Sequence, residues 1–299
     1  MTKIKPHSLK AWILASRPKT LPVGAAPIIA GGTLGYITGS FNQTAFFFSL
    51  LTALLLQIIS NLANDLFDFK KGADKNRKGP LRVTASGLVS EKNMTVAIVL
   101  FTLLALLSGS FLVYIGGIAF AILGLFAVLS AIAYTAGPYP LGYNGLGDIF
   151  VLIFFGPVAV SGTQYLTSGT ITFIAIPVSI SIGLLAANVL AVNNIRDLNE
   201  DIISGKKTLV VRFGLKEGYY QFVFSLLIAY GTPVFLSFHL KSIYPLLPLA
   251  LVILSFNHAK KLLRAKTATQ YNILLAKNSL MTVIYAIITS ISLILATLP

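Results

Sequence analysis

Long apolar stretches separated by short polar segments run along almost the whole chain. A helix needs about 20 mainly apolar residues to cross the hydrocarbon core of a bilayer. Stretches of this kind predict nine membrane-spanning helices, at residues 20–40, 45–67, 94–114, 117–135, 146–166, 173–195, 219–238, 242–257 and 276–297. We therefore expect an all-α integral membrane protein whose single domain spans residues 1–299.

The composition supports a membrane protein. Of the 299 residues, 56% are hydrophobic and only 11% are charged, whereas about 25% of the residues in a soluble domain are charged. A membrane bundle tolerates this composition because lipid solvates its outer surface. The chain has no cysteine, which excludes disulfides, thiolate metal sites and thiol nucleophiles.

The basic residues predict the orientation in the membrane. With nine spans, the N-terminal segment and the connections after spans two, four, six and eight lie on one side. All of the 23 basic residues except Lys241 fall there, so the positive-inside rule places that side in the cytoplasm and the C-terminus opposite. This pattern accounts for the net charge of +14 without a nucleic-acid partner. The segment before the first span, with Trp12, is typical of a short interfacial helix.

The acidic residues gather on the same side, although acidic residues contribute little to topology. Most belong to two clusters. The first, at the end of the second span, comprises Asn61, Asn64, Asp65, Asp68 and Asp74, and the second, at the end of the sixth span, comprises Asn193, Asp197 and Asp201. A spacing of four places side chains on one helical face, and such a face in a bundle points into a cavity rather than into lipid.

Clustered carboxylates repel one another, and burial strengthens the repulsion. A divalent cation relieves it, and Mg²⁺ takes oxygen ligands from carboxylates, waters and substrate phosphates. The two clusters therefore predict a site where Mg²⁺ bridges a diphosphate and offsets its charge as it departs. Arg82 and Lys206, which follow the clusters, are candidates for diphosphate contact. For any single acidic residue, a solvated helix end is the simpler explanation.

Span 2 and its acidic end, followed by two further spans, resembles span 6 and its acidic end. We expect two parallel four-helix halves, at about 20–135 and 146–257, followed by a ninth helix at 276–297, with the site between the halves.

Two further residues are weaker candidates for this site. Asp148 either binds an acceptor or caps a helix, and Tyr134 either faces the site or anchors the chain at the membrane interface.

These motifs resemble those of the UbiA superfamily of intramembrane aromatic prenyltransferases, which carries NxxxDxxxD motifs at the ends of helices 2 and 6. The second motif matches through Asn193, Asp197 and Asp201. The first matches through Asn64, Asp65 and Asp68, but Gly72 stands at the next motif position and the next acid is Asp74. This variant, together with the stretches at 16–21, 137–166 and 193–214, is similar to the branch that acts on 1,4-dihydroxy-2-naphthoate.

The resemblance implies nine helices around a central cavity that opens laterally to lipid, and Mg²⁺ dependence. It also implies polyprenyl transfer from polyprenyl diphosphate to 1,4-dihydroxy-2-naphthoate with loss of carbon dioxide. On this hypothesis Asp68, Asp74, Asp197 and Asp201 hold the metal, and Asp65 is a possible base. Diphosphate contacts are expected from Asn61, Asn64, Arg82, Asn193 and Lys206. The alternatives are another acceptor, such as 4-hydroxybenzoate or homogentisate, or a transporter. No obligate protein partner is inferred.

Overall fold

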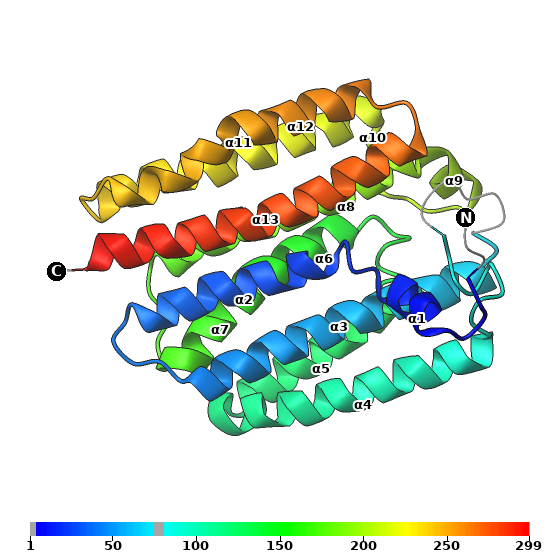
Figure 1. Cartoon of the computed structure of the whole chain (residues 1–299), viewed down its shortest axis with the longest axis horizontal. Coiled ribbons are helices and arrows are strands. Elements are labelled where there is room, and N and C mark those ends of the chain that lie inside the picture. Colours follow the sequence, from blue (N-terminus) through cyan, green and yellow to red (C-terminus); the bar gives the residue numbers. More distant parts are fainter. Residues whose placement is uncertain (1–3, 74–80, 299) are drawn as a thin grey trace.

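The computed structural model describes residues 4–73 and 81–298, and the described residues form helices but no strand. The long helices run roughly along one direction (Figure 1). The elements are α1 (Leu9–Ser16), α2 (Leu21–Tyr36), α3 (Gln43–Lys70), α4 (Glu91–Gly116), α5 (Ile118–Ala133), α6 (Gly147–Ile153), η1 (Phe154–Val158), α7 (Ala159–Ser168), α8 (Ala175–Arg196), α9 (Leu198–Ile203), α10 (Leu209–Phe213), α11 (Leu215–His239), η2 (Tyr244–Leu251), α12 (Val252–Arg264) and α13 (Ala268–Thr297).

The predicted all-α membrane architecture is confirmed. Within the described residues, seven helical segments are long and apolar enough to cross a bilayer, and α2 and α5 are shorter apolar helices. Each of the nine predicted stretches coincides with one of these segments. The predicted division into two parallel halves stays a prediction.

Several helix boundaries differ from the expectation. Helix α13 begins at Ala268 rather than at 276, because Thr267 and Gln270 form a capping box that starts the helix in a polar stretch. Helix α12 continues to Arg264 for a similar reason: its last turn is basic, and cations are favoured at a helix C-terminus. The short helices α9, which contains Asp201, and α10 come after α8 and were not predicted.

The fifth predicted span is interrupted rather than continuous. Gly156 has non-helical dihedral angles, with φ −102° and ψ −107°. The next residue, Pro157, has no backbone N–H and disrupts the hydrogen-bond ladder of a helix. A Cβ on Gly156 would lie 2.7 Å from the carbonyl oxygen of Ser179 in α8, so glycine permits close packing at this bend.

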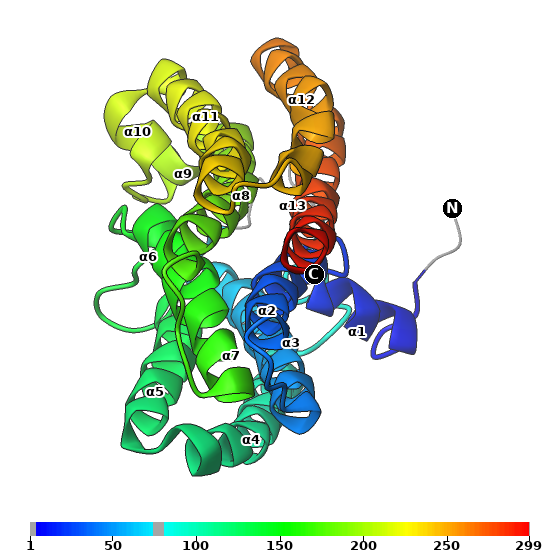
Figure 2. The ribbon, with the colours of Figure 1, turned by 90° about the vertical axis from the view of Figure 1, so that its left-hand side faces the viewer.

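The hydrophobic core has two main parts. The larger part joins α2, α8, α11 and α13, and the smaller part joins α1, α3 and α4. Helix α13 packs against both α2 and α8, which brings the last span beside the first. Helix α5 lies at the edge beside α4 (Figure 2), and none of its residues is buried. The wall of the bundle is therefore thin at α5.

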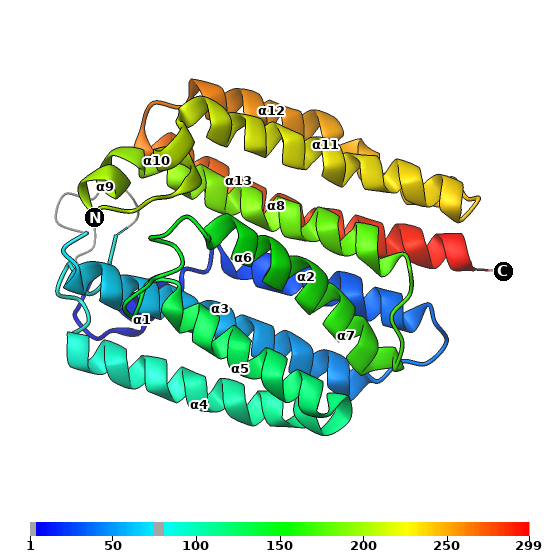
Figure 3. The same cartoon turned by 180° about the vertical axis from the view of Figure 1, so that it is seen from behind.

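Both acidic clusters lie at the same end of the bundle. Figure 3 shows α9 and α10 at this end, next to the end of α3, and the C-terminus at the opposite end. The N-terminal helix α1 lies near the cluster end as well, where its residues Ala11 and Ala15 pack into the core with α3. The bundle therefore brings together two polar segments that lie more than a hundred residues apart in the sequence.

Candidate active site

A cavity of about 680 Å³ lies inside the bundle and reaches both clusters. Its walls come mainly from α2, α3, α4, α5, α7 and α8. The polar end is lined by Asn61, Asn64, Asp68, Arg82, Tyr134, Tyr143, Asn193, Asp197, Asp201 and Lys206, whereas most of the other lining residues are apolar. A polar end attached to an apolar chamber suits a ligand with a charged head and a hydrocarbon tail.

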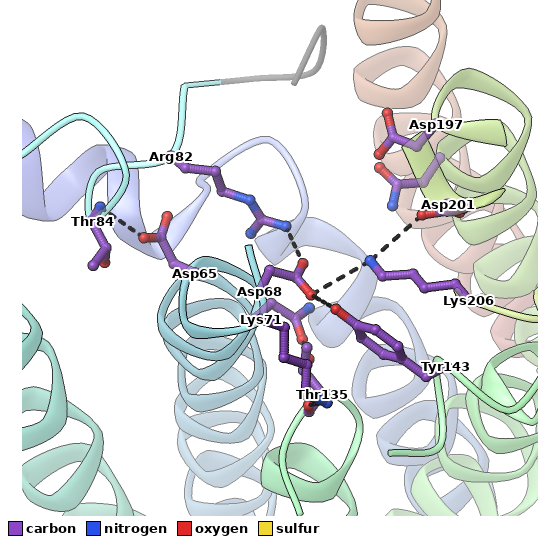
Figure 4. A network of polar contacts seen from close by, with 12 residues as sticks. Asp65, Asp68, Lys71, Arg82, Thr84, Thr135, Tyr143, Asp197, Asp201 and Lys206 are labelled. Carbon is purple, nitrogen blue, oxygen red and sulfur yellow. Dashed lines mark hydrogen bonds and ion pairs between the residues drawn. The ribbon is translucent and has the colours of Figure 1, made fainter. Parts of the chain in front are cut away.

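Asp68 is the centre of the polar end. Its Oδ2 accepts a hydrogen bond from Arg82 Nη2 at 2.8 Å, and its Oδ1 accepts one from the Tyr143 hydroxyl at 2.9 Å. The Lys206 ammonium lies 3.5 Å from Asp68 Oδ1 and also 3.5 Å from Asp201 Oδ1. A single lysine thus bridges the two clusters (Figure 4). The structure therefore brings Asp68 and Asp201 together across the cavity.

The second cluster lies where α8 ends. Helix α8 stops at Arg196, and Asp197 has the non-helical angles φ −94° and ψ 11°. The chain nevertheless continues in helical register, because the Asp201 N–H donates to the Asp197 carbonyl at 2.8 Å. Asn193, Asp197 and Asp201 all line the cavity, so the spacing of four placed them together despite the break.

Arg196 holds Asp197 in place. Its Nε and Nη2 donate to the two carboxylate oxygens of Asp197 at 2.6 and 2.7 Å, a bidentate geometry that is strong and specific. Nη1 donates to Asn272 Oδ1 in α13 at 2.7 Å, and Nη2 also donates to Asn193 Oδ1. The second cluster is therefore tied to both α8 and α13.

The donors at the polar end suit Mg²⁺ in kind, since they are carboxylate and amide oxygens. Burial above all, with smaller effects of Asp197 and Asp68, raises the pKa of Asp201 to about 6 against the opposing effect of Lys206. A divalent cation stabilises the ionised form of a carboxylate that burial disfavours. In residues 4–73 and 81–298, however, no three acidic or histidine side chains are already grouped as metal ligands, because Arg82, Arg196 and Lys206 pair with the carboxylates.

A model of the UbiA prenyltransferase family matches residues 25–291. The chain belongs to this family. It is 45% identical over 221 residues to the 1,4-dihydroxy-2-naphthoate octaprenyltransferase of Haemophilus influenzae, covering 71% of this chain and 72% of the relative. It is 44% identical over 221 residues to the enzyme of the same name from Escherichia coli, covering 72% of each.

Solved structures of UbiA homologues share the fold. A homologue from Archaeoglobus fulgidus bound to GPP and Mg²⁺ superposes with a TM-score of 0.67 at 16% sequence identity, covering 94% of this chain and 99% of that one. The same homologue bound to DMAPP and Mg²⁺ gives a TM-score of 0.68. This UbiA family member is thus a multi-pass membrane protein of known fold.

Two of the predicted site residues, Asp65 and Asp148, lie outside the cavity lining in this UbiA protein. Asp65 is buried outside the cavity lining, where both of its oxygens accept backbone N–H groups. Asp148 lies in the first turn of α6 rather than at its N-cap, which is Leu146, and accepts from Gln221 Nε2 at 2.9 Å. Asp74 lies outside the described residues.

The asparagines of the first cluster also bind the scaffold. Asn61 Nδ2 donates to the Ser16 carbonyl at 2.9 Å, which links α3 to α1. Asn64 Oδ1 accepts from the Thr135 hydroxyl, just after α5. Both residues line the cavity while holding neighbouring helices, so they shape the polar end as well as facing it.

Sequence reasoning missed Tyr143 as a site residue. Besides its bond to Asp68, its ring lies 4.1 Å from the Lys71 ammonium and 4.8 Å from that of Lys206. Its carbonyl accepts the Lys207 N–H at 2.7 Å, which joins the loop before α6 to the loop after α9. A tyrosine in a polar loop carries no helical periodicity, so only its place in the 137–166 stretch offered a signal.

The far part of the cavity is apolar. Ala105 and Leu112 of α4, together with Val128 of α5, contribute to its lining. Phe120 also lines the cavity, and its ring stacks on that of Tyr165, which is outside the lining, with centroids 5.7 Å apart. This stack joins the start of α5 to α7 at the end of the chamber that is remote from the clusters.

Proposed function

We propose that this protein transfers a polyprenyl group from polyprenyl diphosphate to 1,4-dihydroxy-2-naphthoate, releasing diphosphate and carbon dioxide and giving demethylmenaquinol. The observation that carries the proposal is the meeting of Asp68, Asp201 and Lys206 at the polar end of an apolar chamber. The names of the two bacterial relatives, each more than 40% identical, support the acceptor.

The diphosphate head binds at the polar end in this proposal. Asp68, Asp197 and Asp201 would hold Mg²⁺, with Asp74 as a further ligand, and the metal would supply positive charge that stabilises the diphosphate as a leaving group. Arg82 and Lys206, now paired with carboxylates, turn to phosphate oxygens once the metal takes the carboxylates. Asn61, Asn64 and Asn193 complete the polar wall. Mg²⁺ dependence is supported by the solved homologues that contain Mg²⁺.

The prenyl tail extends into the apolar chamber toward Phe120. Helix α5 has no buried residue and packs against α3 and α4. We propose that lipid-borne substrates enter and leave laterally on the α5 side, since little packing holds this wall.

The acceptor ring reacts at its carboxylate-bearing carbon. The allylic C–O bond breaks and the diphosphate leaves with the electron pair, while the naphthol ring supplies the electrons of the new C–C bond. Loss of carbon dioxide then returns an electron pair to the ring, so no ring proton is lost at that carbon. Tyr134, which lines the cavity, is our candidate for acceptor contact, and Asp148 joins α6 to α11 through Gln221.

The orientation in the membrane is also a proposal. The N-terminus and the loops with the two clusters face the cytoplasm, and the C-terminus lies on the other side of the cell membrane. The basic residues at the cluster end support this orientation by the positive-inside rule.

A product assay tests the function. The purified protein in lipid nanodiscs receives prenyl diphosphates of several lengths with 1,4-dihydroxy-2-naphthoate, 4-hydroxybenzoate or homogentisate, with Mg²⁺ or with EDTA, and products are identified by mass spectrometry. We expect a decarboxylated prenyl product from dihydroxynaphthoate alone, and only with Mg²⁺. A product from another acceptor, or substrate flux through liposomes without prenyl transfer, would contradict the proposal.

A further inference from the structure

Asp65 and Asp68 lie one helical turn apart on α3 and hold the same loop from two sides. The Asp65 carboxylate is 2% exposed, and it accepts the Val83 N–H at 3.1 Å and the Thr84 N–H at 2.9 Å. Asp68 accepts from the side chain of Arg82 at 2.8 Å. Three consecutive loop residues are thus bound by two neighbouring acids of α3. Figure 4 shows the contacts of Arg82 and Thr84.

The loop after Arg82 is a compact unit with its own hydrogen bonds. The Ser86 N–H donates to the Arg82 carbonyl at 3.0 Å, and the Leu88 N–H donates to the Val83 carbonyl at 2.9 Å. The side chains of Val83 and Val89 are fully buried against α3 and α4. The N–H groups of Val83 and Thr84 begin this unit, and Asp65 satisfies them as an N-cap residue satisfies the start of a helix.

This arrangement sets the position of Arg82. Arg82 is 7% exposed and lines the polar end of the cavity, and the residues next to it are held by Asp65 through their backbone. A long arginine side chain on a free loop would lose conformational freedom when it binds a ligand, and anchoring it beforehand removes part of that cost.

We propose that Asp65 is a positioning residue that acts through Arg82: it holds residues 83 and 84 so that the guanidinium of Arg82 faces the diphosphate. Asp65 is therefore not the base that accepts a proton from the acceptor. A base must reach the proton that it abstracts, whereas Asp65 lies outside the cavity lining with both oxygens bound to backbone N–H groups. The proposal rests on the proposed function, since it takes diphosphate as the ligand of Arg82.

A double-mutant cycle in the full-length protein tests the link between the two residues. Binding of inorganic diphosphate with Mg²⁺ is measured by calorimetry in nanodiscs for wild type, Asp65→Ala, Arg82→Ala and the double variant. A lost charge-assisted bond corresponds to roughly a tenfold weaker affinity, and we expect this for each single variant. The double variant should be no weaker than Arg82→Ala, because residues that act as one unit are not additive.

Hydrogen exchange separates local release of the loop from general unfolding, since Asp65 is buried. In Asp65→Ala we expect faster exchange in peptides that cover residues 81–89 and unchanged exchange in α8 and α11. Ser255→Ala is the matched control, because it also removes a buried hydrogen bond, the 2.6 Å contact with Tyr230, but lies away from the cavity lining. It should leave diphosphate affinity unchanged.

The pH dependence of turnover distinguishes positioning from base catalysis. If Asp65 acts through Arg82, Asp65→Asn keeps the acidic limb of the pH–rate profile and raises KM for the prenyl diphosphate. Loss of that limb, additive effects in the double variant, or normal diphosphate binding by Asp65→Ala would overturn the proposal. Failure of the proposed function gives a different result from failure of this proposal. If the wild type binds diphosphate but does not prenylate dihydroxynaphthoate, the proposed function is wrong, and the double-mutant cycle still tests the link between Asp65 and Arg82.

Discussion

The two acidic clusters carry the same residue types but are built differently. In the second cluster, Asn193, Asp197 and Asp201 all line the cavity. In the first cluster, Asp68 lines it while Asp65 holds a loop. In the second cluster, a spacing of four residues places the three side chains on one face. In the first cluster, Asp68 faces the ligand site, whereas Asp65 binds a loop of the scaffold.

The basic partners differ in the same way. Asp197 is paired with Arg196, its neighbour in the chain, which also bonds to Asn272 in α13. Asp68 is paired with Arg82, which belongs to a separate loop. The second cluster is therefore held by the helix bundle, and the first depends on how the loop is anchored. We expect substitutions to affect them differently.

The largest effect is expected from the carboxylates that face the cavity. Asp68→Ala and Asp197→Ala should each lower prenyl transfer by at least roughly 100-fold, because each removes several kcal/mol of metal-mediated stabilisation. Asp65→Ala should lower it only about tenfold, by the cost of one charge-assisted contact. Transfer from radiolabelled prenyl diphosphate in membranes measures all three. Near-normal turnover in both Asp68→Ala and Asp197→Ala would refute the metal site.

The two arginines should differ in their effect on stability. Arg196→Ala removes the bidentate partner of the buried Asp197 carboxylate and the hydrogen bond to Asn272 in α13, and breaking a buried ion pair costs roughly 3–5 kcal/mol. Arg82→Ala should cost less, because Asp68 keeps the Tyr143 hydroxyl and Lys206. Thermal unfolding in detergent gives the comparison, with Arg196→Lys as the control that keeps the charge. Equal unfolding temperatures for the two alanine variants would mean that the bundle does not support the second cluster more firmly.

Asp201 predicts a pH effect that belongs to the second cluster. Burial, then Asp197 and Asp68, raise its pKa to about 6 against the opposing effect of Lys206, so the carboxyl takes up a proton as the pH falls through 6. Because a metal needs the ionised form, apparent Mg²⁺ affinity should be about tenfold weaker one pH unit below that pKa. Magnesium titration of prenyl-transfer activity from pH 7.5 to 5 measures this.

The raised pKa of Asp201 has the opposite effect on the stability of the metal-free protein: stability falls, rather than rises, with increasing pH. Unfolding restores the lower pKa of the carboxyl, so this group destabilises the metal-free fold as the pH rises from about 4 to about 6. In EDTA, the Asp201→Asn variant should lack this pH-dependent contribution to the free energy of unfolding. If the apparent Mg²⁺ affinity of the wild type does not change between pH 7.5 and 5, Asp201 is not a ligand.

Tyr143→Phe should have the smallest effect, since Tyr143 belongs to neither cluster and contacts Asp68 of the first cluster and the bridging Lys206. The variant removes the hydroxyl bond to Asp68 but keeps the ring beside Lys71 and Lys206. The loss of one such bond corresponds to roughly a tenfold decrease in kcat/KM or less. Tyr143→Leu also removes the ring and should cost more. If both variants behave alike, the ring does not contribute to holding the lysines.

Prediction from sequence succeeded where the physical cause is local. Bilayer thickness sets the length of an apolar stretch, so the nine spans were visible in the hydropathy pattern. The cap at Thr267 and Gln270 and the bend at Gly156 and Pro157 lay inside or beside such stretches, where hydropathy carries little information. Asp197 and Asp201 were found because they follow a helix with a regular spacing.

The amino-acid sequence alone determined the spans, the two acidic clusters that follow two of them and the family, since apolarity and motif spacing are properties of neighbouring residues. Only the tertiary structure decided that Asp65 binds a loop while Asp68 faces the cavity, that Lys206 joins the two clusters, and that Tyr143 lies between them. These roles depend on contacts between residues far apart in the chain. Such contacts are set by how the helices pack, which no local pattern of apolar and polar residues records.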